Sequence, residues 1–236
     1  GLFRARAFRG ASLSIVLLSF GAGALMLSLT QYLQFVLGYE PLQAGLAFLP
    51  YMAAGIVFNG VGAGLGARVS NRALIVSGLL VMAVGFGVIA TLTDGYGTLL
   101  AGLVIMGMGA GLAGPSSYSA LMGAIPPERA GVGSALNDTV QQVGMALGVA
   151  VIGSVLAQVY TAAMPGSAPA VARESISGAL SLRDPALAEA AREAFGSAMS
   201  VGSVAALGCS VLAAGVALFL LRPRATAERP VPERVG

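Results

Sequence analysis

Long stretches without a charged residue dominate the chain and predict its elements. Charge-free runs cover residues 10–39, 41–67, 73–93, 95–127 and 194–221, and a further run that begins at Ala130 is interrupted first by Asp138. The hydrocarbon core of a bilayer, ~30 Å thick, is crossed by about 20 apolar residues in helical form. We therefore predict six transmembrane helices, at about 11–37, 44–66, 73–92, 98–123, 131–159 and 196–221.

Composition supports a membrane protein. Hydrophobic residues make up 56% of the 236 residues and charged residues only 10%, whereas a soluble domain carries about 25% charged residues. Helices that are apolar all round need lipid or other helices around them. The predicted fold class is an all-α, polytopic membrane protein, in which residues 1–221 form a six-helix transmembrane bundle and the Pro- and Arg-rich residues 222–236 form a disordered cytoplasmic tail.

The basic residues, all of them arginine, predict the orientation of this bundle. Alternating sides along six helices place ten arginines on the side that holds both chain ends and three on the other, all three in residues 160–195. Basic residues beside short loops stay cytoplasmic, so both ends should face the cytoplasm of a bacterial plasma membrane. The long external loop at 160–195, with a short surface helix starting near Pro185, is either a solvated connector or a lid.

The composition argues against several classes of function, because the residues that their chemistry needs are missing. The chain has no histidine and one cysteine, Cys209, in an apolar run, so the usual nucleophile–base pairs and metal sites cannot be built. We expect no enzyme activity, no cofactor and no bound metal. The arginines form no single stripe, so we expect no nucleic-acid partner either. The chain begins without Met or a signal peptide, and we interpret it as a piece of a longer protein.

Glycines four residues apart predict close helix packing. Small residues at this spacing let helix backbones approach each other in lipid, and the pairs that fit are 60/64, 62/66, 107/111 and 144/148. Pro115 falls inside the fourth predicted helix and should kink it, because proline lacks the N–H and clashes with the preceding turn.

Polar side chains within the spans mark the candidate site. The first helix carries Gln31 and Gln34, the second carries Asn59, and the fifth carries Asn137, Asp138 and Gln141. Bare amides and acids are costly in lipid, so these faces should point at other helices or at a water-filled cavity. The amides could simply bond neighbouring helices. Asp138 could either be an interfacial residue paired with Arg68, Arg72 or Arg129, or a protonatable group on a substrate path.

The stretch YLQFVLGYEPLQAGLAFLPYMAAGI resembles the first external hairpin in the carboxy-terminal half of the 14-helix drug:proton antiporters, a branch of the major facilitator superfamily. The matching residues are Tyr32, Gln34, Gly38, Tyr39, Pro41, Gln43, Ala44, Gly45 and Pro50, with Glu40 where serine is common. The stretch PPERAGVGSALNDTVQQVGMALGVAVIG resembles the penultimate helix of the same branch. Relatives often have a basic residue where this chain has Gln141.

Residues 64–78, GLGARVSNRALIVSG, are similar to the cytoplasmic loop motif of the superfamily. Gly64, Arg68 and Arg72 are retained, but the aspartate of the motif is absent. The resemblance covers roughly residues 3–221 and implies one half of a transporter, in which two six-helix bundles rock about a midplane site. It therefore implies an amino-terminal half as partner, protons as coupling ions and a small-molecule substrate.

These expectations combine into one functional hypothesis. The chain is half of a secondary active transporter that exports amphipathic drugs or metabolites across the plasma membrane by proton antiport. Gln31, Gln34, Asn59, Asn137 and Gln141 are the candidates for the substrate cavity, and Asp138 is the candidate for proton or cation coupling. Two alternatives remain open: a dedicated exporter of a single small metabolite or amino acid, and a non-transporting membrane scaffold.

Overall fold

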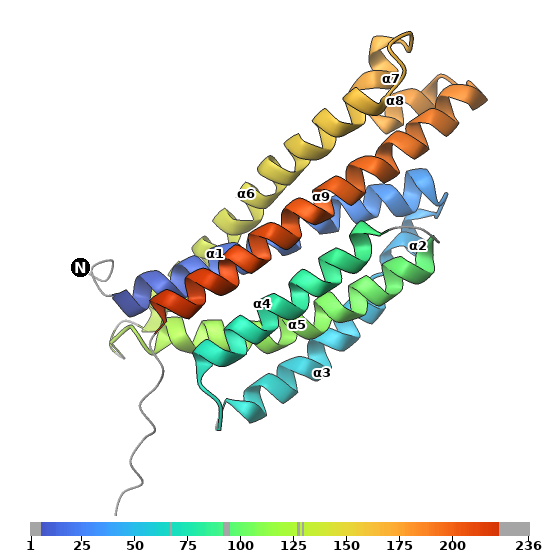
Figure 1. The fold of residues 1–236 in the computed structure, drawn as a ribbon. Coiled ribbons are helices and arrows are strands. Elements are labelled where there is room, and N and C mark those ends of the chain that lie inside the picture. The colour runs from blue at the N-terminus through green and yellow to red at the C-terminus, as the bar shows by residue number, and fades with distance from the viewer. Residues whose placement is uncertain (1–5, 67, 92–94, 127, 129, 222–236) are drawn as a thin grey trace, which may run out of the picture.

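The computed structural model describes residues 6–66, 68–91, 95–126, 128 and 130–221, and these form an elongated bundle of helices (Figure 1). The long helices are α1 (Arg6–Gln31), α3 (Leu49–Leu65), α4 (Asn71–Ala90), α5 (Tyr96–Met122), α6 (Ala130–Ala163) and α9 (Pro185–Leu220). The π-helix η2 (Tyr32–Val36) continues α1, and three short helices are α2 (Pro41–Leu46), α7 (Ala170–Glu174) and α8 (Ile176–Ser181). The predicted tail at 222–236 lies outside the described residues.

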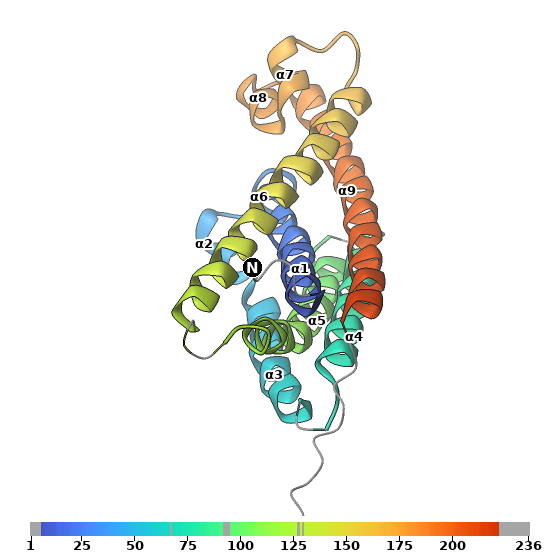
Figure 2. The same cartoon turned by 90° about the vertical axis from the view of Figure 1, so that its left-hand side faces the viewer.

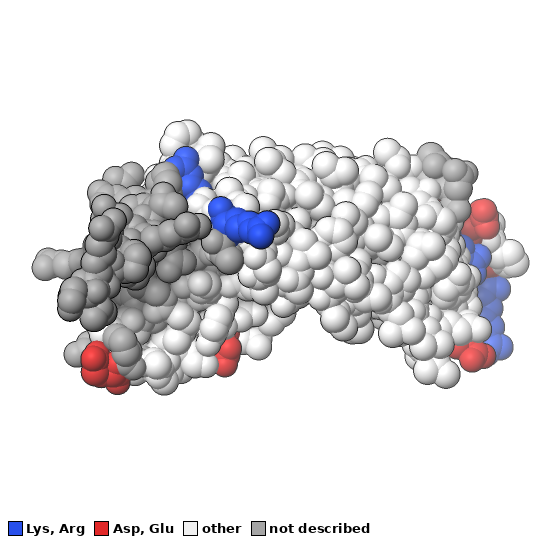
Figure 3. Space-filling model, turned by 90° about the horizontal axis from the view of Figure 1, so that it is seen from below, with Lys and Arg blue, Asp and Glu red and all other residues white. Residues whose placement is uncertain are grey.

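Six segments of the described chain are long and apolar enough to cross a membrane, which confirms the predicted number of spans. They are Phe8–Val36, Pro41–Leu65, Asn71–Ala90, Tyr96–Met122, Ala130–Ala163 and Pro185–Leu220. The exposed charged side chains agree with this, because on the face shown in Figure 3 they gather toward the two ends of the molecule and leave an uncharged band between. The fold class is therefore the one that the sequence predicts.

The last helix begins earlier than predicted. The sequence placed the sixth span at 196–221 after a loop at 160–195, but α9 runs without a break from Pro185 to Leu220. Asp184 caps its start, because its Oδ1 accepts hydrogen bonds from the backbone N–H groups of Ala186 (2.9 Å) and Leu187 (3.3 Å). Proline suits the first helical position, and no further proline follows within the helix. The expected surface helix is thus the first part of the span itself.

The helices α6 and α9 are longer than a bilayer requires. They have 34 and 36 residues, which at 1.5 Å per residue gives about 50 Å each against a hydrocarbon core of ~30 Å. Both project beyond the other long helices at one end, and the α7–α8 hairpin connects them there (Figure 1). This end of the molecule therefore carries a small helical cap outside the membrane-spanning core.

The long helices pack in pairs: α4 and α3 each lie against α5, α6 lies against α1, and α4 also packs against α9. In Figure 2, α4 and α9 border one side of the bundle, α3 and α6 lie away from them, and α1 and α5 lie between. Glycines make the contacts of α5 with its two neighbours close. A Cβ atom added to Gly78 of α4 would lie 2.6 Å from the carbonyl oxygen of Gly109, and one added to Gly111 would lie 2.5 Å from that of Gly55 on α3.

The helices α1 and α6 cross at a second glycine contact, which we call the α1/α6 crossing and which consists of Gly144 and Gly148 against Ser19 and Phe20. A Cβ atom at Gly144 would lie 2.9 Å from the Cβ of Ser19, and one at Gly148 would lie 2.8 Å from the carbonyl carbon of Phe20. The two backbones therefore touch where these glycines lie. The 107/111 and 144/148 spacings are confirmed as close packing sites.

The carboxy-terminal end of α1 is built differently from its middle. The backbone N–H of Leu37 donates to the carbonyl of Tyr32 at 3.1 Å, which is the i→i+5 pattern of a π-helix. The chain then turns at Gly38, whose φ of 72° lies in the left-handed region that favours glycine. This turn leads into α2 and the second span.

Candidate functional site

The polar residues predicted from sequence fall into three separate places. Gln31 borders a cavity beside the α7–α8 hairpin, which we call the hairpin pocket. Asn59 lies in an open groove between α3 and α5, which we call the Asn59 groove. Asn137 and Gln141 share a third cavity, which we call the Asn137 pocket. The single cavity that the sequence suggested is therefore divided among three sites in this bundle.

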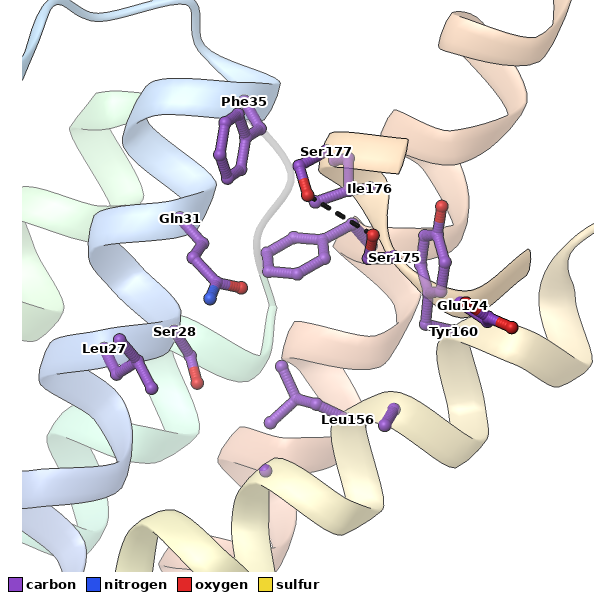
Figure 4. Close-up of a pocket in the computed structure, with 13 residues that line it drawn as sticks. Leu27, Ser28, Gln31, Phe35, Leu156, Tyr160, Glu174, Ser175, Ile176 and Ser177 are labelled. Carbon is purple, nitrogen blue, oxygen red and sulfur yellow. Dashed lines mark hydrogen bonds between the residues drawn. The ribbon is translucent and has the colours of Figure 1, made fainter. Parts of the chain in front are cut away.

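The hairpin pocket has a volume of about 200 Å³ and lies among α1, α6, α9 and the α7–α8 hairpin (Figure 4). On the α1 side, Ser28, Gln31 and Phe35 form its wall, and the amide of Gln31 points into the space toward α6 and α8. Glu174 and Ser175 border it from the hairpin. Gln34 is half-buried in η2 and does not form part of this wall.

Hydrogen bonds attach the hairpin to the ends of the long helices. The buried hydroxyl of Tyr160 on α6 donates to the carbonyl of Ala172 at 2.8 Å, and Thr161 donates to the carbonyl of Arg173 at 2.9 Å. Both acceptors belong to α7. The hairpin is therefore held against α6 by side chains of the last two turns of that helix.

The Asn59 groove lies on the side of α3 that no other described helix covers. Its walls are Tyr51, Met52, Gly55, Ile56 and Asn59 from α3 and Ala110 and Gly111 from α5. Asn59 is exposed there, among apolar neighbours. An exposed amide at membrane depth needs a protein or water partner, so this groove is a place where a further polar contact is expected.

The Asn137 pocket lies among α1, α5 and α6 and has a volume of about 90 Å³. Ser19 comes from α1, Ser117 and Tyr118 come from α5, and Asn137 and Gln141 come from α6. Asn137 is 7% exposed although it lies in an apolar helix. The i, i+4 spacing places Asn137 and Gln141 on the same face of α6, which is why both reach this pocket.

Asp138 lies beside this pocket and not on its wall. Its carboxylate is exposed, and its Oδ1 accepts a hydrogen bond from Nδ2 of Asn137 at 3.3 Å. Among the described residues it forms no ion pair, so the pairing with Arg68 or Arg72 that the sequence left open is not made. Arg129, the third possible partner, lies outside the described residues.

The residues of the cytoplasmic loop motif lie around the turn between α3 and α4. Gly64 and Arg68 are exposed and Arg72 is half-buried in the first turn of α4. Ser70 caps that helix by accepting the backbone N–H of Ala73 at 3.3 Å. The turn is therefore ordered by a serine cap, and both arginine side chains remain available to a further partner.

Sequence reasoning missed the serines of the Asn137 pocket. Ser19 and Ser117 stand within long apolar runs, and their spacing to the amides of α6 is not visible in the sequence because they belong to other helices. Serine in a helix commonly bonds the carbonyl four residues earlier, as Ser14 and Ser210 do here at 2.8 and 2.9 Å. A lone serine in a span is thus a weak signal for a site.

Comparison with known proteins identifies the family that this chain resembles. Residues 11–235 match the Major Facilitator Superfamily. The multidrug efflux pump LfrA of Mycolicibacterium smegmatis is 28% identical over 231 residues, which cover 92% of this chain and 46% of LfrA.

Two further relatives are shorter matches. The multidrug resistance protein Stp of Mycobacterium tuberculosis is 33% identical over 157 residues, covering 66% of this chain and 29% of Stp. The puromycin resistance protein pur8 of Streptomyces alboniger is 36% identical over 155 residues, covering 62% of this chain and 31% of pur8. The chain spans less than half the length of each of these relatives.

Proposed function

The chain belongs to the Major Facilitator Superfamily, and on that premise we propose that it is the carboxy-terminal six-helix half of a 14-helix drug:proton antiporter. The complete protein would export amphipathic drugs or metabolites across the bacterial plasma membrane by alternating access. Relatives named as multidrug efflux and resistance proteins support efflux as the activity. The observation that carries the proposal is the exposure of Asn59 and Asp138 on membrane-spanning helices.

The partner of this bundle would be the amino-terminal half of the same transporter. The helices α3 and α6 each pack against one principal neighbour and expose apolar side chains, namely Met52, Ile56, Val57 and Val61 on α3 and Val132, Val143, Leu147 and Val151 on α6. A second bundle docked between α3 and α6 would cover Asn59 and the start of α6. Polar groups on these faces would then line a shared cavity and not meet lipid.

The three polar sites would form one wall of that cavity. Gln31 and Gln34 lie toward the hairpin end, Asn59 lies in the groove of α3, and Asn137 and Gln141 lie toward the start of α6. An amphipathic substrate needs apolar walls with a few polar groups that fix its orientation. Alternating exposure of the two ends would move such a substrate from the side of Gln141 to the side of Gln31.

The coupling role falls to Asp138, because it is an acid on a membrane-spanning helix with no ion pair among the described residues. We expect Asp138→Asn in the full-length protein to lower substrate-induced proton movement in inverted vesicles without preventing membrane insertion. The amide keeps the shape of the side chain and cannot take up or release a proton. Glu128→Gln, which removes an exposed acid just before α6, is the matched control and should leave proton movement unchanged.

Unchanged proton release by Asp138→Asn at normal expression would refute the coupling role. A panel of substrates in the same vesicles separates the alternatives. Export of several unrelated amphipathic compounds supports a multidrug pump, and export of one metabolite alone points to a dedicated exporter. No substrate-dependent proton movement at all would favour a scaffold.

A further inference from the structure

The Asn137 pocket is bordered by a serine whose hydroxyl has no hydrogen-bond partner among the described residues. Ser117 is 1% exposed, and its Oγ has no hydrogen-bond partner among the described residues. An unsatisfied buried hydroxyl costs free energy comparable to a lost hydrogen bond, and the cost is larger at membrane depth because no bulk water is near. Ser117 is one of the residues that border a cavity of about 90 Å³, so a partner for its hydroxyl could lie there.

The rest of the wall has the chemistry that such a partner needs. The hydroxyls of Ser19 and Tyr118 and the amides of Asn137 and Gln141 border the same space. Among the described residues, the amide of Gln141 makes no hydrogen bond. Three helices thus contribute donors and acceptors to one cavity without joining them directly to each other.

The size and charge of the cavity indicate what occupies it. One water molecule takes about 30 Å³ of liquid volume and makes two to four hydrogen bonds in a buried site, so about 90 Å³ holds a cluster of one to three waters. The polar wall is entirely neutral. Neutral hydroxyls and amides do not offset the cost of dehydrating a cation in a membrane, so water fits this site better than a metal ion.

We propose that the Asn137 pocket is a buried hydration site, in which ordered water bonds Ser117 on α5 and connects it with the amides of α6 and with α1. The site lies on the opposite side of the α1/α6 crossing from the hairpin pocket. Water would therefore connect α6 with α1 and α5 in the part of the bundle that lies beyond the close contact of Gly144 and Gly148 with α1. This inference rests on the geometry of the cavity and does not require proton coupling or transport.

One consequence concerns Asp138. Asn137 donates from Nδ2 to Asp138, which leaves its amide oxygen and its second N–H for the water cluster. The water would orient the Asn137 amide toward the carboxylate.

The first test is the thermal stability of Ser117→Ala in the full-length protein. If the hydroxyl is bonded to water, its removal loses that bond and lowers the apparent Tm relative to a reference variant. If the hydroxyl is unsatisfied in a dry cavity, its removal relieves a penalty and raises the apparent Tm. Ser197→Ala, an exposed serine in α9, is the reference because it includes the gain in helix propensity from alanine.

Three outcomes are distinguishable. An apparent Tm below that of Ser197→Ala, equal in sodium and choline chloride, supports the hydration site. An apparent Tm equal to or above that of the reference overturns it. A decrease that appears only in sodium salts overturns it in favour of a cation site. A high-resolution structure of the full-length protein in lipid nanodiscs should show density within hydrogen-bond distance of Ser117 Oγ, and an empty cavity there would contradict the proposal.

Discussion

Alanine at Gly148 should weaken the bundle, because this position is the centre of the α1/α6 crossing. A Cβ atom there would lie 2.8 Å from the carbonyl carbon of Phe20 and closer still to its oxygen. Carbon atoms pack best at ~3.5–4.0 Å, so α1 and α6 would have to separate by roughly 0.7 Å or more. The obstacle is backbone, which no change of side-chain rotamer can move.

The magnitude follows from a comparison within one helix. Gly153 is also in α6, and a Cβ atom there would meet nothing within 4 Å. Glycine to alanine improves helix propensity by about 1 kcal/mol at either position, whereas overpacking at Gly148 costs about 1–3 kcal/mol. The propensity gain cancels in the difference, so Gly148→Ala should be about 1–3 kcal/mol less stable than Gly153→Ala.

The assay is thermal unfolding of the full-length variants in one detergent, followed by circular dichroism at the helical band. For a full-length transporter of about twice this length, about 1 kcal/mol corresponds to ~1–2 °C, so we expect Gly148→Ala to have an apparent Tm lower than Gly153→Ala by roughly 1–6 °C. Gly131→Ala, which also meets nothing within 4 Å, should behave like Gly153→Ala. Equal apparent Tm values for all three variants would refute the close crossing.

Two further predictions concern the end of the bundle that carries the hairpin. Asp184→Ala removes the cap of α9 and should cost about 1 kcal/mol, visible in hydrogen exchange as faster exchange confined to the first turn of α9; exchange as slow as in the unchanged protein would contradict the cap. Tyr160→Phe removes the hydrogen bond to the buried carbonyl of Ala172 and should weaken the attachment of α7 by about 1–3 kcal/mol. This would be measured as faster proteolysis at 164–175. Tyr118→Phe, which changes a more exposed tyrosine, is the control.

The spans were predictable because a membrane-spanning segment can be recognised from its length and its lack of charged residues. Charge-free runs such as 73–93 and 95–127 are long enough for one helix each to cross the hydrocarbon core. The spacing of Gly144 and Gly148 predicted a close contact, and the structure has one there. Gly60 and Gly64 have the same spacing, yet a Cβ atom at either would meet nothing within 4 Å. Spacing identifies which residues share a helix face, and only tertiary structure decides which face has a partner.

The candidate site was harder to predict for the same reason. Gln31, Asn59 and Asn137 belong to three helices, and the sequence does not give the rotation of one helix relative to another. They consequently fall into three cavities. The start of the last span was misplaced because the charges of Glu189, Arg192 and Glu193 assigned the helix predicted near Pro185 to the external loop, whereas the structure joins it to the span as one helix.

Two glycines of α6 that have open space around them are positions at which the bundle can be chemically labelled from either side of the membrane. Gly131 stands near the start of α6, and Gly153 borders the hairpin pocket. A Cβ atom at either position meets nothing within 4 Å, and Cys209, the single thiol of this chain, is half-buried. With Cys209 and any further cysteine of the full-length protein replaced by serine, a membrane-impermeant thiol reagent added to intact cells would react at one of these two positions and spare the other. The pattern would assign each end of the bundle to its compartment, and a change in reactivity at Gly153→Cys on substrate addition would report a change in access to the hairpin pocket.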